Sequence, residues 1–106
     1  MSILNDNDKK SPELKASIVE PILSFCSSAI TFDFLLITIQ KISRLSHYEL
    51  KIYLFYMIEY GVVFYNGRKQ EFKIDKGGID LLNVLEKEKI QKKDIINDIT
   101  ITFENN

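Results

Sequence analysis

Residues 59–74 read EYGVVFYNGRKQEFKI, and this stretch decides the predicted fold. Asn66 and Gly67 lie between two runs of alternating apolar residues, and an Asn-Gly pair accepts positive φ at both central positions of a two-residue turn. The stretch therefore predicts a tight β-hairpin with Arg68 and Lys69 at its tip. Two cations on a protruding hairpin favour contact with an anionic partner, although any tight turn needs polar residues.

The two strands of this hairpin are predicted to bury one apolar face. Val62 and Phe64 precede the turn, and Phe72 and Ile74 follow it with the same alternation. A two-stranded ribbon is at best marginally stable alone in water. We therefore expect the hairpin to pack against helices formed by the rest of the chain.

The composition fits one compact domain. The chain has 106 residues, of which 45% are hydrophobic and 27% are charged, and this length allows a modest core. The single cysteine, Cys26, cannot form an internal disulfide, and with the single histidine, His47, it supplies too few ligands for a zinc site of that kind. No cofactor is predicted, and a reducing cytoplasm is the simplest setting.

No targeting segment or membrane span is predicted. Residues 1–10 are polar and acidic and lack apolar periodicity, so we expect a disordered tail rather than a signal peptide. No apolar run approaches the roughly 18 residues that a membrane-spanning helix requires. The sequence therefore predicts a cytoplasmic protein without a membrane partner.

The charges are unevenly distributed along the chain. The net charge of -1 and the pI near 5.8 argue against indiscriminate binding to polyanions. Residues 41–76 nevertheless contain seven basic and four acidic residues, which leaves a charge of -4 for the remainder. A basic middle between acidic ends fits a binding face, and a bias of this size also arises by chance in small domains.

The first predicted helix begins near Ser11, whose hydroxyl can cap it, and Pro12 suits the first helical position. Pro21 removes one backbone hydrogen bond and clashes with the preceding turn, so the segment is either one kinked helix or two short helices. The apolar residues at helical spacing are Leu14, Ile18, Ile22, Leu23 and Cys26.

A second helix is predicted after a short strand at Ile30, with Thr31 as its N-cap and an end at Gln40 or Lys41. The β-branched residues 37–39 leave a strand open as an alternative. The side chains expected on the buried face are Phe32, Leu35, Leu36, Ile39 and Ile42.

The third predicted helix has the clearest start. Ser46 and Glu49 form a capping box, in which each side chain can bond the backbone N–H of the other residue. Gly61 lies where the chain must leave the helix, so we expect it in the left-handed C′ conformation. The predicted core-facing stripe of this helix is Leu50, Tyr53, Leu54, Met57 and Ile58.

The C-terminal part is predicted to contain one more helix and one strand. Asp75 can cap a helix with apolar side chains at Ile79, Leu81, Leu82, Val84 and Leu85. Apolar residues then alternate with threonines over 99–103 in the manner of a strand. We expect that strand to pair with the hairpin edge or with a second chain, so residues 90–106 are interpreted as an extension used in assembly.

The order of elements predicts an α+β fold of the winged helix-turn-helix type over residues 11–89. Three helices, with a short turn at Arg44 and Leu45 before the third, lead into a two- or three-stranded wing. A C-terminal helix and an extra strand near 99–103 follow. In this arrangement, Arg68 and Lys69 lie on the wing and point away from the core.

Several short motifs accompany this order of elements. They are Leu45 and Ser46 before the third helix, Tyr53, Leu54 and Met57 within it, the runs 59–63 (EYGVV) and 72–77 (FKIDKG), and Leu81 with Leu82 in the last helix. With these motifs, the segment 21–89 resembles the small archaeal winged-helix regulators of the ArnR-like type. It is also similar to the related winged-helix chromatin proteins of Sulfolobales.

The resemblance implies binding to double-stranded DNA, usually as a dimer, with the third helix as the reading element. Lysine and arginine would mostly contact phosphates, whereas base reading would fall to His47, Tyr48 or Lys51. The residues that the resemblance places in contact with DNA are Lys41, Arg44, Ser46, His47, Tyr48, Lys51, Arg68 and Lys69.

The third helix is more apolar than a reading helix needs to be. Ile52, Phe55 and Tyr56 leave it apolar over much of its circumference. Either these residues form a homodimer interface, or DNA contacts are confined to the first turn and a half. A second function therefore stays open, that of a winged-helix protein-interaction module that binds no DNA. No phosphate loop or catalytic motif supports an enzyme.

Overall fold

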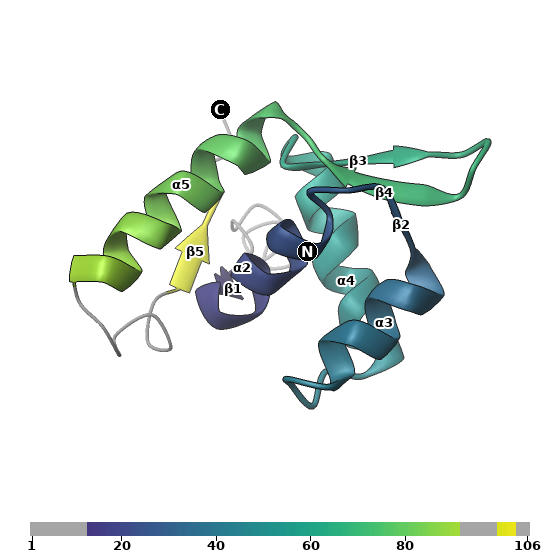
Figure 1. The fold of residues 1–106 in the computed structure, drawn as a ribbon, viewed down its shortest axis with the longest axis horizontal. Coiled ribbons are helices and arrows are strands. Elements are labelled where there is room, and N and C mark those ends of the chain that lie inside the picture. Colours follow the sequence, from purple (N-terminus) through teal and green to yellow (C-terminus); the bar gives the residue numbers. More distant parts are fainter. Residues whose placement is uncertain (1–12, 92–99, 104–106) are drawn as a thin grey trace, which may run out of the picture.

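The computed structural model describes residues 13–91 and 100–103. Within those residues the α+β prediction is confirmed, with four helices and two small antiparallel sheets (Figure 1). The elements in chain order are β1 (Glu13–Lys15), α2 (Ala16–Phe25), β2 (Ile30–Thr31), α3 (Phe32–Gln40), α4 (His47–Glu59), β3 (Val63–Asn66), β4 (Glu71–Ile74), α5 (Lys76–Gln91) and β5 (Thr100–Thr102).

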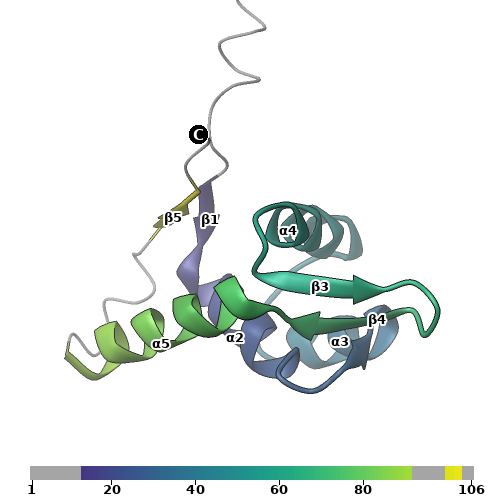
Figure 2. The same cartoon turned by 90° about the horizontal axis from the view of Figure 1, so that it is seen from above.

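The larger sheet has three strands in the order β2-β4-β3. The predicted strand at Ile30 is confirmed, and it pairs antiparallel with β4 so that Ile30 lies opposite Phe72. The predicted hairpin is confirmed as β3 and β4. Figures 1 and 2 both show its tip at the end of the molecule opposite α5, so the loop between β3 and β4 protrudes from the fold.

The predicted two-residue turn of this hairpin is wrong. Asn66 is the last residue of β3 and pairs with Glu71, so the connection is the four-residue loop 67–70. The side-chain Oδ1 of Asn66 accepts hydrogen bonds from the backbone N–H groups of Arg68 at 3.0 Å and Lys69 at 3.3 Å. The positive φ of 55° falls on Gln70. The loop therefore uses the Asn66 side chain as an acceptor, rather than its tolerance of positive φ.

The apolar face of the hairpin is displaced by one residue on β3 from the prediction. The register pairs Val63 with Ile74 and Tyr65 with Phe72, so these residues share one face. Phe64 lies on the opposite face and is 54% exposed. Side chains alternate along a strand, so moving the register by one residue moves each side chain of β3 to the other face. The longer loop produces this one-residue shift.

Helix α4 begins and ends as predicted. The hydroxyl of Ser46 accepts from the N–H of Glu49 at 3.0 Å, and the Glu49 carboxylate accepts from the N–H of Ser46 at 2.9 Å, which completes the capping box. Gly61 has a φ of 75°. The N–H of Val62 donates to the carbonyl of Met57 at 2.9 Å, as in a Schellman motif. The hydrogen bond that ends the helix therefore also holds Val62 in its buried position, one residue before the strand begins.

The buried faces of α3 and α4 are narrower than predicted. Thr31 caps α3 as expected and accepts from the N–H of Phe34 at 3.3 Å. Two expected core residues are exposed: Ile42 beyond the end of α3, at 61%, and Ile58 near the end of α4, at 39%. The expected residues that are buried in these two helices are Leu35, Ile39, Leu50, Leu54 and Met57.

The predicted start of the first helix is wrong. Leu14 lies in β1, and α2 begins only at Ala16. Residues 13–15 are extended because they pair with β5, and the N–H of Lys15 also donates to the hydroxyl of Tyr53 at 3.1 Å. Pro21 lies inside one continuous helix, so the alternative with two short helices is not observed. The expected cap at residues 11 and 12 lies outside the described residues.

The predicted C-terminal strand is observed as β5, but its expected pairing with the hairpin edge is wrong. Strand β5 pairs antiparallel with β1 of the same chain, and Ile101 lies opposite Leu14. Phe103 stacks on Tyr60, with ring centroids 4.7 Å apart. Figure 2 shows this two-stranded ribbon between α5 and α4, apart from the three-stranded sheet. The expected strand residue at position 99 lies outside the described residues.

Helix α5 starts where predicted, after Asp75. The Oδ1 atom of Asp75 accepts from the N–H of Lys76 at 2.7 Å, and its backbone carbonyl accepts the N–H groups of the first turn. Leu85 is buried, whereas Ile79 and Val84 are 50% and 55% exposed. The helix therefore contributes a narrower apolar stripe than its composition predicts.

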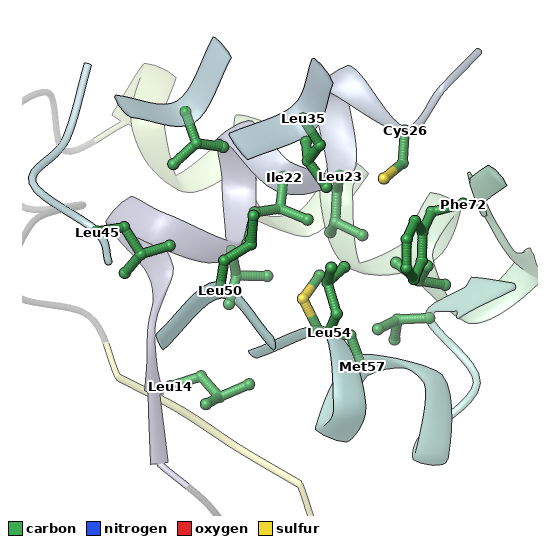
Figure 3. Packing of buried hydrophobic residues seen from close by; sticks show 14 of the residues in the cluster. Leu14, Ile22, Leu23, Cys26, Leu35, Leu45, Leu50, Leu54, Met57 and Phe72 are labelled. Atoms are coloured by element: carbon green, nitrogen blue, oxygen red, sulfur yellow. The ribbon is translucent and has the colours of Figure 1, made fainter. Parts of the chain in front are cut away.

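The core lies where α2, α3 and α4 meet the sheet. Figure 3 shows the side chains of Ile22 and Leu23 from α2 converging on Leu50 and Leu54 from α4, with Phe72 entering from the sheet. All of these side chains are buried, most of them completely. Over the part of the chain that the structure describes, none of the helices has the length and apolar character needed to cross a membrane.

Cys26 belongs to this core, and its thiol predicts a pH dependence of stability. Burial raises the pKa of Cys26 from 9.0 to about 12, because desolvation penalises the thiolate. Above pH 9 the unfolded chain releases a proton that the folded chain keeps. We therefore expect the free energy of unfolding to fall with rising pH, by about 1.4 kcal/mol between pH 8 and pH 10 from this group.

Urea unfolding of the parent and of Cys26→Ala at both pH values checks this expectation. Other groups titrate equally in the two proteins, so the variant should lack only the contribution of the thiol. An identical loss of stability with pH in parent and variant would contradict the assignment.

Candidate nucleic-acid interface

A groove of about 700 Å³ lies between α4, the start of α3 and the hairpin. It gathers Lys51 from α4 and Lys69 from the hairpin loop, two residues that the sequence analysis assigned to DNA contacts. Its other lining residues come from the end of β2, the start of α3, α4 and the hairpin: Thr31, Phe32, Asp33, Leu54, Phe55, Ile58, Tyr65, Gln70 and Phe72.

The helical wall of the groove is supported by Phe32. The His47 ring packs edge-on against it, with centroids 5.0 Å apart, and the Nζ atom of Lys51 lies 5.9 Å from the centroid of the same ring. The contact between a cation and an aromatic face orients the lysine in the lining of the groove. The first two turns of α4 are thus held against the start of α3.

The hairpin wall of the groove is aromatic. Tyr65 packs on Phe72 with centroids 4.7 Å apart, and Phe72 lies 6.5 Å from Phe32. These three rings connect the hairpin to the helical wall. Lys69 extends from the loop that Asn66 orders, so the position of this cation depends on the Asn66 side chain. The loop conformation therefore decides which cation reaches the groove.

The charges around the groove are mostly positive. Lys51 and Lys69 oppose the single carboxylate of Asp33 among the lining residues. Arg68 is exposed at the tip of the hairpin and does not line the groove. A concave surface lined by two cations, with a third on the neighbouring hairpin tip, attracts phosphate oxygens.

The remaining predicted DNA contacts are distributed over a wider area. Arg44 is exposed in the connection between α3 and α4, and Tyr48 in the first turn of α4 is 71% exposed. The Ser46 hydroxyl already accepts a hydrogen bond as the cap of α4. Lys41, at the end of α3, lines a different hollow.

The three residues predicted to form a dimer interface differ in exposure. Phe55 is 60% exposed and lines the groove, whereas Ile52 and Tyr56 are partly buried. Tyr56 packs against the core, and its ring contacts Phe55 edge-on with centroids 5.3 Å apart. Phe55 is therefore the most exposed of the three, and the dimer interface stays a prediction.

Sequence reasoning missed several residues of the groove. Phe32 was expected on the buried face of the second helix, and Tyr65 was not among the residues predicted for the apolar face of the hairpin. Ile58 was expected in the buried stripe of α4. The correct hairpin register would have revealed Tyr65, but no local signal distinguishes Phe32 as a support for Lys51.

The described residues offer no metal site. In residues 13–91 and 100–103, no group of three His, Cys, Asp or Glu side chains lies close enough to hold a metal ion. The comparisons with known proteins are also without a match: no family model, no curated protein and no solved structure corresponds significantly to this chain.

Proposed function

We propose that this chain is a winged helix-turn-helix protein that binds double-stranded DNA and regulates transcription. In this proposal, α4 enters the major groove and the hairpin contacts the phosphate backbone. One observation carries it: Lys51 on α4 and Lys69 on the hairpin line the same groove. Two elements distant in sequence thus present cations to one side of the molecule.

The topology supports the winged-helix part of the proposal. The order of α2, β2, α3, α4 and the hairpin, with strand order β2-β4-β3, is that expected of a helix-turn-helix followed by a wing. Helix α4 is capped at Ser46, so its first turn is rigid. The resemblance to archaeal winged-helix regulators supports the same function.

The proposed contacts divide by chemistry. Lys51, Arg68 and Lys69 would bind phosphates, which position a protein without reading sequence. His47 and Tyr48, exposed in the first turn of α4, would approach base edges. Each phosphate contact releases counterions, so we expect binding to weaken with added salt in proportion to the number of such contacts.

The double substitution Arg68→Ala/Lys69→Ala tests the wing. We expect it to weaken binding to random duplex DNA by about tenfold or more and to lower the slope of log K against log salt by about two, because two phosphate contacts are lost. Fluorescence anisotropy with labelled duplex at about 50 and 200 mM salt measures both effects.

Lys15→Ala/Lys87→Ala is the matched control. It removes the same charge from exposed positions on β1 and α5, outside the groove and the hairpin. We expect its salt slope to equal that of the parent. If the two double variants weakened binding equally, the hairpin would have no special role, and if Arg68→Ala/Lys69→Ala bound like the parent, the wing assignment would be wrong.

A second candidate function is favoured by the exposed apolar side chains of the groove. Phe55, Ile58 and Tyr65 are 60%, 39% and 40% exposed. Contacts with phosphates and base edges are mainly polar, so DNA binding does not explain these exposed apolar side chains. A protein-interaction module would use these three side chains as anchors for a partner protein. The anisotropy experiment separates the two functions, because such a module binds no duplex DNA even at low salt.

A further inference from the structure

The outward face of α3 is apolar at its centre. Phe34 and Ile37 are 62% and 54% exposed, and they lie on the side of the helix opposite the buried Leu35 and Ile39. With 3.6 residues per turn, Lys41 continues the same stripe. Isolated exposed apolar residues are ordinary, but two adjacent ones on a helix that contributes other residues to the core indicate a contact surface.

A hollow of about 750 Å³ adjoins this stripe. It lies between the end of α2, strand β2 and α3. The side chains of Phe25, Ala29 and Ile30 form the apolar part of its wall. Phe34, which is 62% exposed, is also one of its lining residues. The surface therefore combines a protruding aromatic ring with a recess of matching apolar character.

Opposite charges mark the two ends of this surface. Glu71 is paired across the sheet with Thr31, the N-cap of α3, so it lies at the N-terminal end of the helix. Lys41 is the C-cap residue at the other end. At 1.5 Å per residue the two ends of the helix are about 15 Å apart. Both charged residues line the hollow.

We propose that this face of α3 binds a second copy of the chain, with the two α3 helices antiparallel about a two-fold axis near Ile37. Antiparallel packing brings Lys41 of each copy to Glu71 of the partner subunit. The same rotation directs each Phe34 into the other copy's hollow. A two-fold interface uses one patch twice, so the patch must be complementary to itself. The opposite charges at the two ends of this surface meet that requirement.

The interface is small and therefore weak. We expect a contact limited to one nine-residue helix and the adjoining hollow to bury less than the roughly 1,200 Å² of a standard specific interface. A micromolar dissociation constant is expected, so the protein is a monomer when dilute and a dimer when concentrated. The surface differs from the groove and from Ile52, Phe55 and Tyr56, and it assigns Lys41 to a subunit contact.

Sedimentation velocity of the full chain without DNA tests this dimer, from about 5 to 500 µM, a range that brackets micromolar affinity. The mass is expected to rise from 12.4 kDa towards twice that value. Phe34→Asp should remain monomeric throughout. Phe64→Asp is the matched control, because Phe64 is 54% exposed on the outward face of the hairpin, and it should dimerise like the parent.

Charge reversal tests the antiparallel arrangement. Lys41→Glu and Glu71→Lys should each weaken the dimer by about tenfold, since each creates two like-charge pairs across the axis. The double variant Lys41→Glu/Glu71→Lys should regain the parent affinity. A folding defect or a general loss of charge cannot produce this rescue.

A cysteine at the axis gives an independent result. Ile37→Cys should form an inter-chain disulfide with oxidised glutathione as the oxidant, whereas Phe64→Cys should not, and the buried Cys26 does not interfere. A parent of 12.4 kDa at every concentration, a dimerising Phe34→Asp, or a double charge variant without rescue would each overturn the proposal. Since no DNA is present, none of these outcomes depends on the proposed function.

Discussion

Gly78→Ala is expected to lower the free energy of unfolding by about 3 kcal/mol or more. Gly78 is in the first turn of α5, where alanine would normally stabilise a helix by about 1 kcal/mol. Here an added Cβ would overlap the backbone carbonyl oxygen of Val62 and lie 2.8 Å from Cγ1 of Ile74. Because the Val62 carbonyl also accepts the N–H of Asp75 at 3.0 Å, it cannot move away without losing that bond.

Two other glycines provide a graded comparison. Gly67 does not have positive φ, and its added Cβ would meet nothing closer than 3.9 Å, so Gly67→Ala should change stability by less than about 0.5 kcal/mol. Gly61 has space but a φ of 75°, so Gly61→Ala should cost about 1 kcal/mol. Urea unfolding of all three variants measures the order, and a Gly78→Ala protein as stable as Gly67→Ala would contradict the close contact between α5 and the Val62 carbonyl.

Truncation after residue 99 is expected to destabilise the protein by about 3 kcal/mol. The deletion removes β5, and with it the cover of Leu14, which is only 4% exposed in the intact chain. It also removes Phe103, whose ring stacks on Tyr60 at the end of α4. The loss reaches the proposed DNA-binding helix, because Lys15 of β1 bonds Tyr53 of α4 and Phe103 stacks on Tyr60, the C-cap residue of α4.

Truncation after Phe103 is the control for this deletion. It shortens the chain but keeps the pairing of β1 with β5 and the ring stack, so its thermal midpoint should match that of the parent. The shorter truncation should unfold several degrees earlier in a calorimetric scan, as a change of this size predicts for a domain of about 100 residues. Equal midpoints for the two truncations would show that β5 adds nothing to the fold.

The candidate site was predictable in part. Lys51 and Lys69 were both selected from the sequence, and the structure brings them into one groove. Lys41 was selected by the same reasoning, yet it lies beside Phe34 and Glu71 in another hollow. A charged residue near a helix end carries no local signal of the direction that its surface faces, so only the packing of α3 separates Lys41 from the others.

The sequence by itself determined the features that depend on neighbouring residues. The capping box of Ser46 and Glu49, the Thr31 cap and the left-handed Gly61 each involve atoms within a few positions along the chain. Local hydrogen bonds and φ preferences therefore specify them before any tertiary contact forms.

Tertiary structure decided the secondary structure of the apolar segments and the segments with which they pair. Leu14 has helical spacing to the residues after it, but backbone pairing with β5 makes it part of a strand. The face of Phe64 depended on a register fixed between two strands and their loop. The sequence shows the spacing of the apolar residues. The partner of each apolar residue depends on the competition among all apolar surfaces of the chain for burial.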